Sequence, residues 1–272
     1  MKKICAFILV AFIFSTTAFA YDHLITNETS SVKEQGTLQA EASILYTTAS
    51  KKFDNDGKSV DLKDDATNLF VPLKIRWGCR LVPNLEFLVI LPFEKWDLGD
   101  DGESELGDIW FAGKYAIMPE GFLTLRGALD IPTGDDKKGL GGAGGFGIDI
   151  AAMTQKQLSS IKVDGQVGVR YNVEDSDTKW QPGLGVYLDG EGSYELTEAW
   201  AAQLGLELMF IGDGKADGND RKDTGVNWIE LNVGAKYKLG ENMGLKGDVL
   251  YNVAGKNSNQ YFGVLVRFCY GF

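Results

Sequence analysis

Histidine is almost absent from this chain, and that absence removes the usual general base of hydrolytic enzymes. The 272 residues contain one histidine, His23, which lies near the N-terminus and outside every segment that alternates like a strand. A Ser-His or Asp-His pair therefore cannot be assembled in the body of the chain. We predict that the protein is not an enzyme and has no catalytic residues. A hydrolase that uses carboxylates alone is the remaining enzymatic alternative.

Long apolar runs are also absent, apart from a short one at the start. Residues 4–14 are apolar but fall short of the ~20 residues that a transmembrane helix needs. Lys2 and Lys3 precede this run, and Ala18-Phe19-Ala20 follows it as a cleavage site. The pattern predicts that residues 1–20 are a cleaved signal peptide and that the protein is exported.

Basic side chains are outnumbered by acidic ones. The formal net charge of the chain is −11, and loss of the two lysines of the signal leaves 25 basic and 38 acidic side chains, or −13. Nucleic-acid binding requires a basic face. The composition therefore argues against a nucleic-acid partner.

Cysteine is scarce, and the two that follow the signal are poorly placed for a bond. Strand alternation predicts that Cys79 points outward at the end of one strand and that Cys269 points inward on the last. Two strands would separate them by roughly 10 Å, which is too far for a disulfide. We predict two free thiols.

The C-terminal residues 260–272 alternate with period two, as a strand does. The apolar face carries Phe262, Val264, Val266, Phe268, Tyr270 and Phe272, whereas the other face is small or charged apart from one leucine. A final strand that is apolar on alternate positions and ends on phenylalanine is typical of outer-membrane β-barrels, in which that face meets lipid. We predict that Phe268, Tyr270 and Phe272 form the signal that the outer-membrane assembly machinery recognises.

Eleven earlier segments alternate in the same way, which predicts an all-β protein. The twelve expected strands are 36–48, 67–78, 85–94, 107–117, 122–131, 144–152, 161–172, 183–195, 200–211, 226–239, 244–254 and 260–272. Short turns alternate with mostly longer Asp- and Gly-rich loops, among them 49–66 and 95–106. A propeller would need four short strands in each repeat, and here each repeat holds two long ones. We therefore predict a transmembrane antiparallel up-and-down β-barrel of about twelve strands over residues 36–272, in contact with outer-membrane lipid. Residues 21–35 form a periplasmic N-terminal leader that either plugs the lumen or stays outside it.

Aromatic side chains gather at the ends of the expected strands, where the two membrane interfaces would lie. One predicted girdle contains Trp77, Tyr115, Trp200, Tyr237, Tyr270 and Phe272, and the other contains Tyr46, Phe93, Trp96, Tyr171, Phe210 and Phe262.

The segment that opens the fourth expected strand carries a recognisable motif. Leu106-Gly107-Asp108 is followed six residues later by Lys114-Tyr115, and an apolar run that ends in Leu91-Pro92 precedes it. The motif resembles that of the "MetA-pathway of phenol degradation" family of outer-membrane transporters, although Glu105 stands where glycine is common. The resemblance implies a barrel that passes small hydrophobic or aromatic compounds.

The inward faces of the strands are charged, and the charges are sorted by depth. The expected mouth residues on the long-loop side are Asp108, Asp130, Asp149 and Glu230. The expected periplasmic residues on the short-turn side are Lys74, Arg76, Lys114, Arg126, Lys236, Lys238, Lys246 and Arg267. These side chains either form salt bridges across a water-filled interior or line a path that selects solutes.

Two prolines lie within expected strands, where neither can donate a ladder hydrogen bond. Pro72 and Pro92 should lie almost opposite each other in one hairpin, both pointing inward. We predict that two missing donors at one level loosen the wall and create a lateral opening for an apolar solute. The alternative is that both prolines are simply tolerated at bulges.

Neither a metal nor a cofactor site is predicted. The acidic loops fail as EF-hands, because centring one on Gly57 puts Lys52 and Lys63 at ligand positions. Gly139–Gly144 matches a dinucleotide motif but no βαβ unit surrounds it. The sequence thus predicts a passive outer-membrane channel for a small solute. The rival is a structural or surface-interaction barrel with a closed lumen and acidic loops that bind a partner.

Overall fold

The computed structural model describes residues 29–99, 101–118, 121–134 and 145–272, and nearly all of its regular structure is β-strand. The strands are β1 (Leu38–Phe53), β2 (Ser59–Gly78), β3 (Leu85–Leu98), β4 (Asp101–Leu106), β5 (Ile109–Ala116), β6 (Thr124–Ile131), β7 (Gly147–Leu158), β8 (Ile161–Asn172), β9 (Trp180–Gln181), β10 (Gly185–Glu195), β11 (Trp200–Ile211), β12 (Lys215–Ala216), β13 (Asn219–Asp220), β14 (Val226–Lys238), β15 (Met243–Lys256) and β16 (Ser258–Gly271). Across these ranges there is no helix long and apolar enough to cross a membrane.

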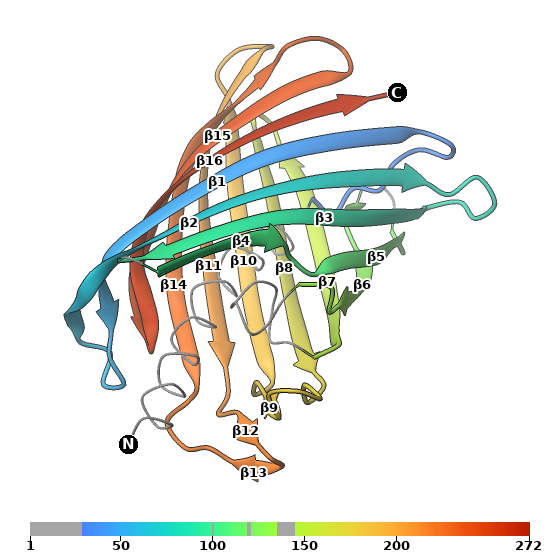
Figure 1. The fold of residues 1–272 in the computed structure, drawn as a ribbon. Coiled ribbons are helices and arrows are strands. Elements are labelled where there is room, and N and C mark those ends of the chain that lie inside the picture. The colour runs from blue at the N-terminus through green and yellow to red at the C-terminus, as the bar shows by residue number, and fades with distance from the viewer. Residues whose placement is uncertain (1–28, 100, 119–120, 135–144) are drawn as a thin grey trace.

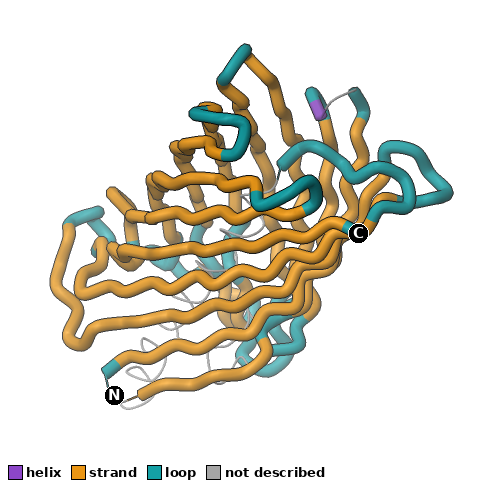
Figure 2. The backbone as a smooth tube through the Cα atoms, turned by 90° about the horizontal axis from the view of Figure 1, so that it is seen from above, coloured by secondary structure: helices purple, strands orange, loops and turns teal. Residues whose placement is uncertain are grey.

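The strands close into an antiparallel barrel of 12 strands. Along the wall each hairpin pairs with the next, in the order β1, β2, β3, β5, β6, β7, β8, β10, β11, β14, β15 and β16, and β16 pairs with β1 to complete the ring. Figure 1 shows the strongly tilted β1, β2 and β3 across one side of the molecule, and Figure 2 shows the curved wall seen from above. The predicted fold class is confirmed.

The predictions of loops at 49–66 and 95–106 are wrong, because most of these residues extend the strands. β1 and β2 continue to a tight turn at residues 54–58, and the residues expected in loop 95–106 form the paired ends of β3 and β4. These extensions are polar and largely exposed, so they lack the apolar alternation by which a membrane-facing strand is recognised in sequence.

The fourth strand of the ring is broken. β4 pairs with the long-loop end of β3, β5 pairs with the short-turn end of β3, and Gly107 and Asp108 separate them. β6 pairs with β5 over Ile109–Ala116, and within the described residues β4 pairs with β3 alone. The described part of the wall therefore leaves the side of β4 that faces away from β3 unpaired.

Two long loops meet outside the barrel in a small sheet of β9, β12 and β13, at the lower end of the molecule in Figure 1. Asp213 fixes one of them, because its Oδ1 accepts hydrogen bonds from the backbone N–H of Thr224 at 3.0 Å and of Gly225 at 2.7 Å. The Asn257 amide joins this loop to the β1–β2 turn by donating to Asn55 Oδ1 and to the Asp223 carbonyl. The loops thus form a connected rim.

Apolar side chains cover the outside of the barrel, as the alternation predicts. The exposed set includes Val163, Val167, Val169, Leu204, Leu206 and Val264. Rings stack along the short-turn edge, with the Phe87 ring 6.0 Å from that of Trp77 and 5.8 Å from that of Phe111. The prediction that Trp96 belongs to an aromatic girdle is wrong, because its side chain is buried on the inner face of β3.

Both cysteines are free, as predicted, but Cys79 does not face outward. It is buried immediately after β2, where its N–H donates to the Leu85 carbonyl. The strand ends at Gly78, so the alternation that was used to place Cys79 no longer applies at that position.

Candidate functional site

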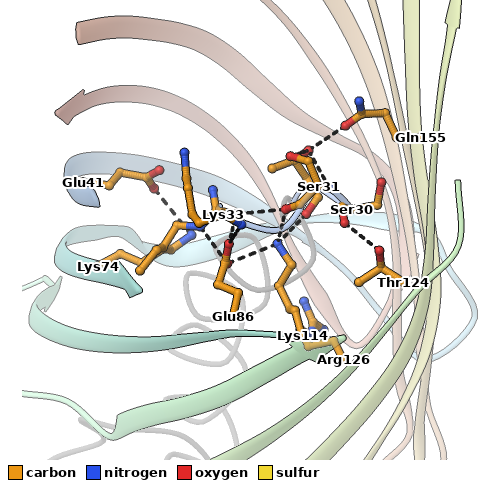
Figure 3. Close-up of polar contacts among 12 residues, drawn as sticks. Ser30, Ser31, Lys33, Glu41, Lys74, Glu86, Lys114, Thr124, Arg126 and Gln155 are labelled. Carbon is orange, nitrogen blue, oxygen red and sulfur yellow. Dashed lines mark hydrogen bonds and ion pairs between the residues drawn. The ribbon is translucent and has the colours of Figure 1, made fainter. Parts of the chain in front are cut away.

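Residues 29–35, which we call the leader strap, lie inside the barrel at its short-turn end (Figure 3). Lys114 Nζ donates to the carbonyls of Thr29 at 2.7 Å and Ser31 at 2.9 Å. Thr124 Oγ1 donates to the Ser30 carbonyl at 2.7 Å. The inner faces of β5 and β6 therefore hold the strap mainly through its backbone.

Glu86 is the centre of the dock that holds the strap. Its side chain is fully buried and receives the Lys33 N–H at 2.7 Å, Arg76 Nε at 2.9 Å and an ion pair from Lys114 Nζ at 3.4 Å. Arg76 also donates to the Ser31 carbonyl at 3.2 Å. Two cations and a backbone N–H thus compensate one buried carboxylate, which would otherwise be costly to desolvate.

The strap approaches the wall so closely that only glycine fits at two positions. A Cβ on Gly78 would lie 1.9 Å from the carbonyl oxygen of Glu34. Gly121 has φ +72°, and a Cβ there would lie 2.9 Å from Ser30 Oγ, which donates to the Gly121 carbonyl. Close contact at these two points along the wall therefore fixes the path of the strap.

A ladder of ion pairs continues from the dock along β1 and β2 to the wall on the other side of the lumen. Glu191 accepts from Lys236 Nζ at 2.5 Å and from Lys246 Nζ at 2.6 Å. Glu41 lies 3.4 Å from Lys74 and 3.3 Å from Arg267. Of the predicted basic residues of the short-turn side, Arg76 and Lys114 belong to the dock, and four belong to this ladder: Lys74, Lys236, Lys246 and Arg267. Arg126 belongs to a separate cluster, and Lys238 lies exposed at the end of β14.

A second buried cluster lies between the dock and the long loops. Arg126 Nη2 donates to Asp149 Oδ1 at 2.7 Å, and the Tyr187 hydroxyl donates to the same oxygen at 3.0 Å. Arg170 lies 3.9 Å from Asp149 and stacks over the ring of Trp110, 4.7 Å from its centroid. One carboxylate is thus shared by two arginines and a phenol.

The four acids predicted at the mouth have different surroundings. Asp108 accepts the backbone N–H groups of Thr133 at 2.9 Å and Gly134 at 2.8 Å, so it fixes the end of β6 at the break between β4 and β5. Asp130 is buried near the end of β6, and Glu230 accepts the hydroxyl of Tyr261. Alternation within the strands also places further buried acids on the inner face that were not predicted as mouth residues, among them Glu94, Asp189 and Glu207.

Aromatic side chains line the half of the lumen nearer the long loops, which we call the upper lumen. The inward aromatic residues at or above the middle of the barrel are Phe70, Trp96, Trp110, Tyr187, Trp228 and Tyr261. All except Trp96 belong to one apolar cluster with Leu45, Leu250 and Leu265. The sequence prediction considered only the charged residues at inward-facing positions, and these aromatic residues occupy other inward-facing positions on the same strands.

Pro72 and Pro92 are direct partners in the β2–β3 ladder and both point inward, as predicted. Their missing donors do not weaken that hairpin, whose register is unbroken from Ala66 to Gly78. The Pro92 carbonyl accepts the N–H of Gly107 at 3.0 Å, and a residue's nitrogen and carbonyl point to the same side of a strand. Pro92 therefore lacks a donor toward the β4–β5 break. Pro72 lacks one toward β1, where Ser43 and Ile44 have no partners in the β2 register.

The closed ring and its apolar outer surface define a transmembrane β-barrel. The chain belongs to the family described as "Putative MetA-pathway of phenol degradation", which matches residues 22–268.

Solved structures share the fold at low sequence identity. A COG4313 outer membrane channel from Pseudomonas putida F1 is 18% identical, with a TM-score of 0.77 over 89% of this chain and 98% of that one. The translocator domain of the autotransporter NalP from Neisseria meningitidis is 12% identical, with a TM-score of 0.56 over 96% and 98%. The CymD monoaromatic hydrocarbon channel is 8% identical, with a TM-score of 0.51 over 88% of each chain. No curated protein matches the sequence.

Proposed function

We propose that the protein is an outer-membrane channel that admits a small aromatic solute from the long-loop side. The observation that carries this proposal is the aromatic lining of the upper lumen above a floor of buried ions. Buried rings such as those of Trp110 and Trp228 give the interior of the barrel an aromatic character, and an aromatic site with a few polar groups suits a small ligand. Family membership and the hydrocarbon channel among the solved structures agree with this solute class.

The leader strap blocks part of the direct route to the short-turn side. It is held by Arg76, Glu86, Lys114 and Thr124, whose hydrogen bonds to its backbone would have to break before the floor could open. A charged floor is also unfavourable for an apolar solute, which cannot compensate the ions that it displaces. The strap therefore acts as a plug in the proposed function.

The solute leaves sideways, through the wall at the β4–β5 break. Pro92 lacks a donor toward this break, and within the described residues β6 pairs with β5 and not with β4. Replacing Pro92 with Val restores a donor on this seam, whereas Pro72→Val restores one on the β1–β2 seam and is the matched control. We expect Pro92→Val to lower the flux of a phenol-sized aromatic into liposomes without changing ion conductance. Equal effects of the two variants would exclude this exit.

Planar-bilayer recording tests the channel itself. The mature protein should show small, discrete open levels, and a variant that lacks residues 21–35 should show larger ones. Leader-deleted protein that folds but never conducts would overturn the channel proposal.

The rival function is a closed barrel whose outer loops bind a partner. It is favoured by the connected rim, in which Asn257 joins the β1–β2 turn to the loop that contains Asp223. Absence of open levels in both proteins, together with no solute flux, would support the rival.

A further inference from the structure

The dock that holds the strap is built from contacts within the wall of the barrel. Glu86 on β3 is directly opposite Lys114 on β5 in the strand register, and the two side chains form an ion pair at 3.4 Å. Arg76 on β2 donates to both carboxylate oxygens of Glu86, at 2.9 and 3.1 Å. Contacts among three strands therefore position these side chains. A site that is ordered before its ligand arrives loses less entropy on binding.

The dock contacts the strap mainly through the polypeptide backbone (Figure 3). The carbonyls of Thr29, Ser30 and Ser31 all accept hydrogen bonds from side chains of the wall. The N–H of Lys33 donates to Glu86 at 2.7 Å. Every polypeptide offers carbonyls at this spacing, and every residue except proline offers the N–H. An extended segment of another chain can therefore make the same contacts.

Two hydroxyl groups of the strap add contacts that depend on the side chain. Thr29 Oγ1 donates to Gln155 Oε1 on β7 at 3.0 Å, and Ser30 Oγ donates to the Gly121 carbonyl at 2.7 Å. Ser30 is buried, so its side chain is enclosed by the wall. When an extended peptide binds along strands, main-chain hydrogen bonds supply affinity and enclosed side chains supply specificity. The dock thus favours a segment that begins with two small hydroxyl residues.

The direction of the strap determines which end of a segment enters the barrel. Gly36 lies at the short-turn edge, where its N–H donates to the carbonyl of Gly78, the last residue of β2. Thr29, at the other end of the strap, contacts side chains of β7 and β8 inside the barrel. The C-terminal side of a bound segment therefore leads out of the barrel. A protein that binds in this direction inserts its N-terminal tail and leaves its body outside the short-turn end.

We propose that the dock is a peptide-binding site that accepts the extended N-terminal tail of another exported protein, with serine or threonine at the positions of Thr29 and Ser30. The strap is the intramolecular occupant of the same site and competes with the tail. The strap of a second copy is a poor competitor, because its short tether to its own barrel gives it a high effective concentration there. This inference goes beyond the proposed channel, because it concerns an interaction with a protein.

Binding is measured by the fluorescence anisotropy of an acetylated peptide of residues 29–35 with a fluorophore at its C-terminal end. The barrel that lacks residues 21–35 is the host, in detergent micelles, and its folding is checked by heat modifiability. The peptide should bind this barrel at least tenfold more tightly than the full mature chain, in which the tethered strap occupies the dock.

A second host keeps the test decisive if the leader-deleted barrel does not fold. Full-length Lys33→Pro retains the whole leader, but its strap lacks the N–H that Glu86 accepts. The peptide should bind this variant more tightly than it binds the parent chain. Equal binding to both would contradict competition between the strap and the peptide.

Variant peptides test which groups the dock recognises. A peptide with Pro in place of Lys33 lacks one charge-assisted hydrogen bond and should bind at least tenfold more weakly. A peptide with Val in place of Thr29 and Ala in place of Ser30 lacks both hydroxyls and should bind roughly threefold to tenfold more weakly. Replacing Val32 and Glu34 with Ala preserves every contact described above and should leave the affinity nearly unchanged.

Variants of the leader-deleted barrel locate the binding site. Lys114→Met removes the donor to two strap carbonyls and should weaken peptide binding at least tenfold. Lys156→Met, at an exposed position toward the same end of the barrel on β7, is the matched control and should not change binding. Thr124→Val removes one donor at constant shape and should weaken binding roughly fivefold. It decides alone if Lys114→Met does not fold.

Several outcomes would overturn the inference: no binding to the leader-deleted barrel, equal binding to the full chain, or equal losses in Lys114→Met and Lys156→Met. Equal binding of the proline-containing peptide would show that the backbone is not recognised. Conductance plays no part in these measurements. A barrel that binds the peptide but never conducts would therefore leave this inference standing without the channel, whereas a conducting barrel that binds no peptide would do the reverse.

Discussion

Gly78 is the residue at which the strap is most sensitive to a small change. A methyl group there would lie 1.9 Å from the Glu34 carbonyl oxygen, a distance that forces the strap to move. We expect Gly78→Ala to release the strap and raise single-channel conductance toward that of the leader-deleted protein. Gly127→Ala is the control, because no atom lies within 4 Å of its added Cβ. Unchanged conductance in Gly78→Ala would show that the strap does not obstruct the ion path.

Single residues also mark how far sequence reasoning extends. The pairing of Pro72 with Pro92 follows from counting outward from one turn, because register in a hairpin is set by the turn. The role of Asp108 does not follow, because its partners are the backbone N–H groups of Thr133 and Gly134. Every residue except proline has such an N–H group, so the sequence does not indicate which ones a carboxylate will bind.

Among the elements, the loop of residues 212–225 depends on one ionised carboxyl. The pKa of Asp213 is lowered from its ordinary value of 3.8, chiefly by the backbone hydrogen bond from Gly225 and also by those from Asp223 and Thr224. A lowered pKa means that the charged form stabilises the folded loop above the ordinary value and that this contribution disappears as pH falls through the lowered one.

We therefore expect hydrogen exchange within residues 212–225, corrected for the intrinsic rate, to be faster at pH 3 than at pH 7. Asp213→Asn should show the fast pattern already at pH 7. Asp217→Asn, in the same loop, serves as the control and should not. Slow exchange in Asp213→Asn at pH 7 would contradict the assignment.

The last strand closes the barrel, and its end is held on the first strand. The Phe272 N–H donates to the Leu38 carbonyl at 2.8 Å, and its ring stands edge-on to that of Tyr270, with centroids 4.7 Å apart. We propose that these aromatics, with Phe268, guide assembly. Deleting Phe272, or replacing Phe272 and Tyr270 with Asp, should leave little heat-modifiable folded protein in the outer membrane. Cys269→Ser changes a residue on the other face and should be nearly silent; a severe defect there would reverse the face assignment.

Strand ends follow from sequence only where a strand meets lipid. Segments 161–172 and 200–211 coincide with β8 and β11, because their alternation stops where the turns begin. The outer ends of β1 to β4 are paired in water, where nothing selects apolar residues on one face. Their polar composition therefore resembles that of a loop.

At the scale of the whole molecule, the two ends of the barrel differ in their connections. Single cysteines at Ser59, Asp101 and Asn219 should react with an impermeant reagent on intact cells, and one at Asn242 should not. All four positions are exposed in the structure, so a difference in labelling reports the side of the membrane. Labelling at Asn242 alone would invert the barrel.

Because the wall binds the backbone of the strap, the strap should accept some kinds of mutation and not others. Lys114, Thr124 and Glu86 bind carbonyl and N–H groups of residues 29–33, which every substitution except proline retains. Substitutions in this stretch therefore cost little except at Thr29 and Ser30, whose hydroxyls donate to Gln155 and to the Gly121 carbonyl. The spacing between Ser30 and Gly36 is not, since inserting or deleting one residue would move each carbonyl away from its donor. Residues 30–36 should therefore tolerate amino-acid substitutions far better than insertions or deletions.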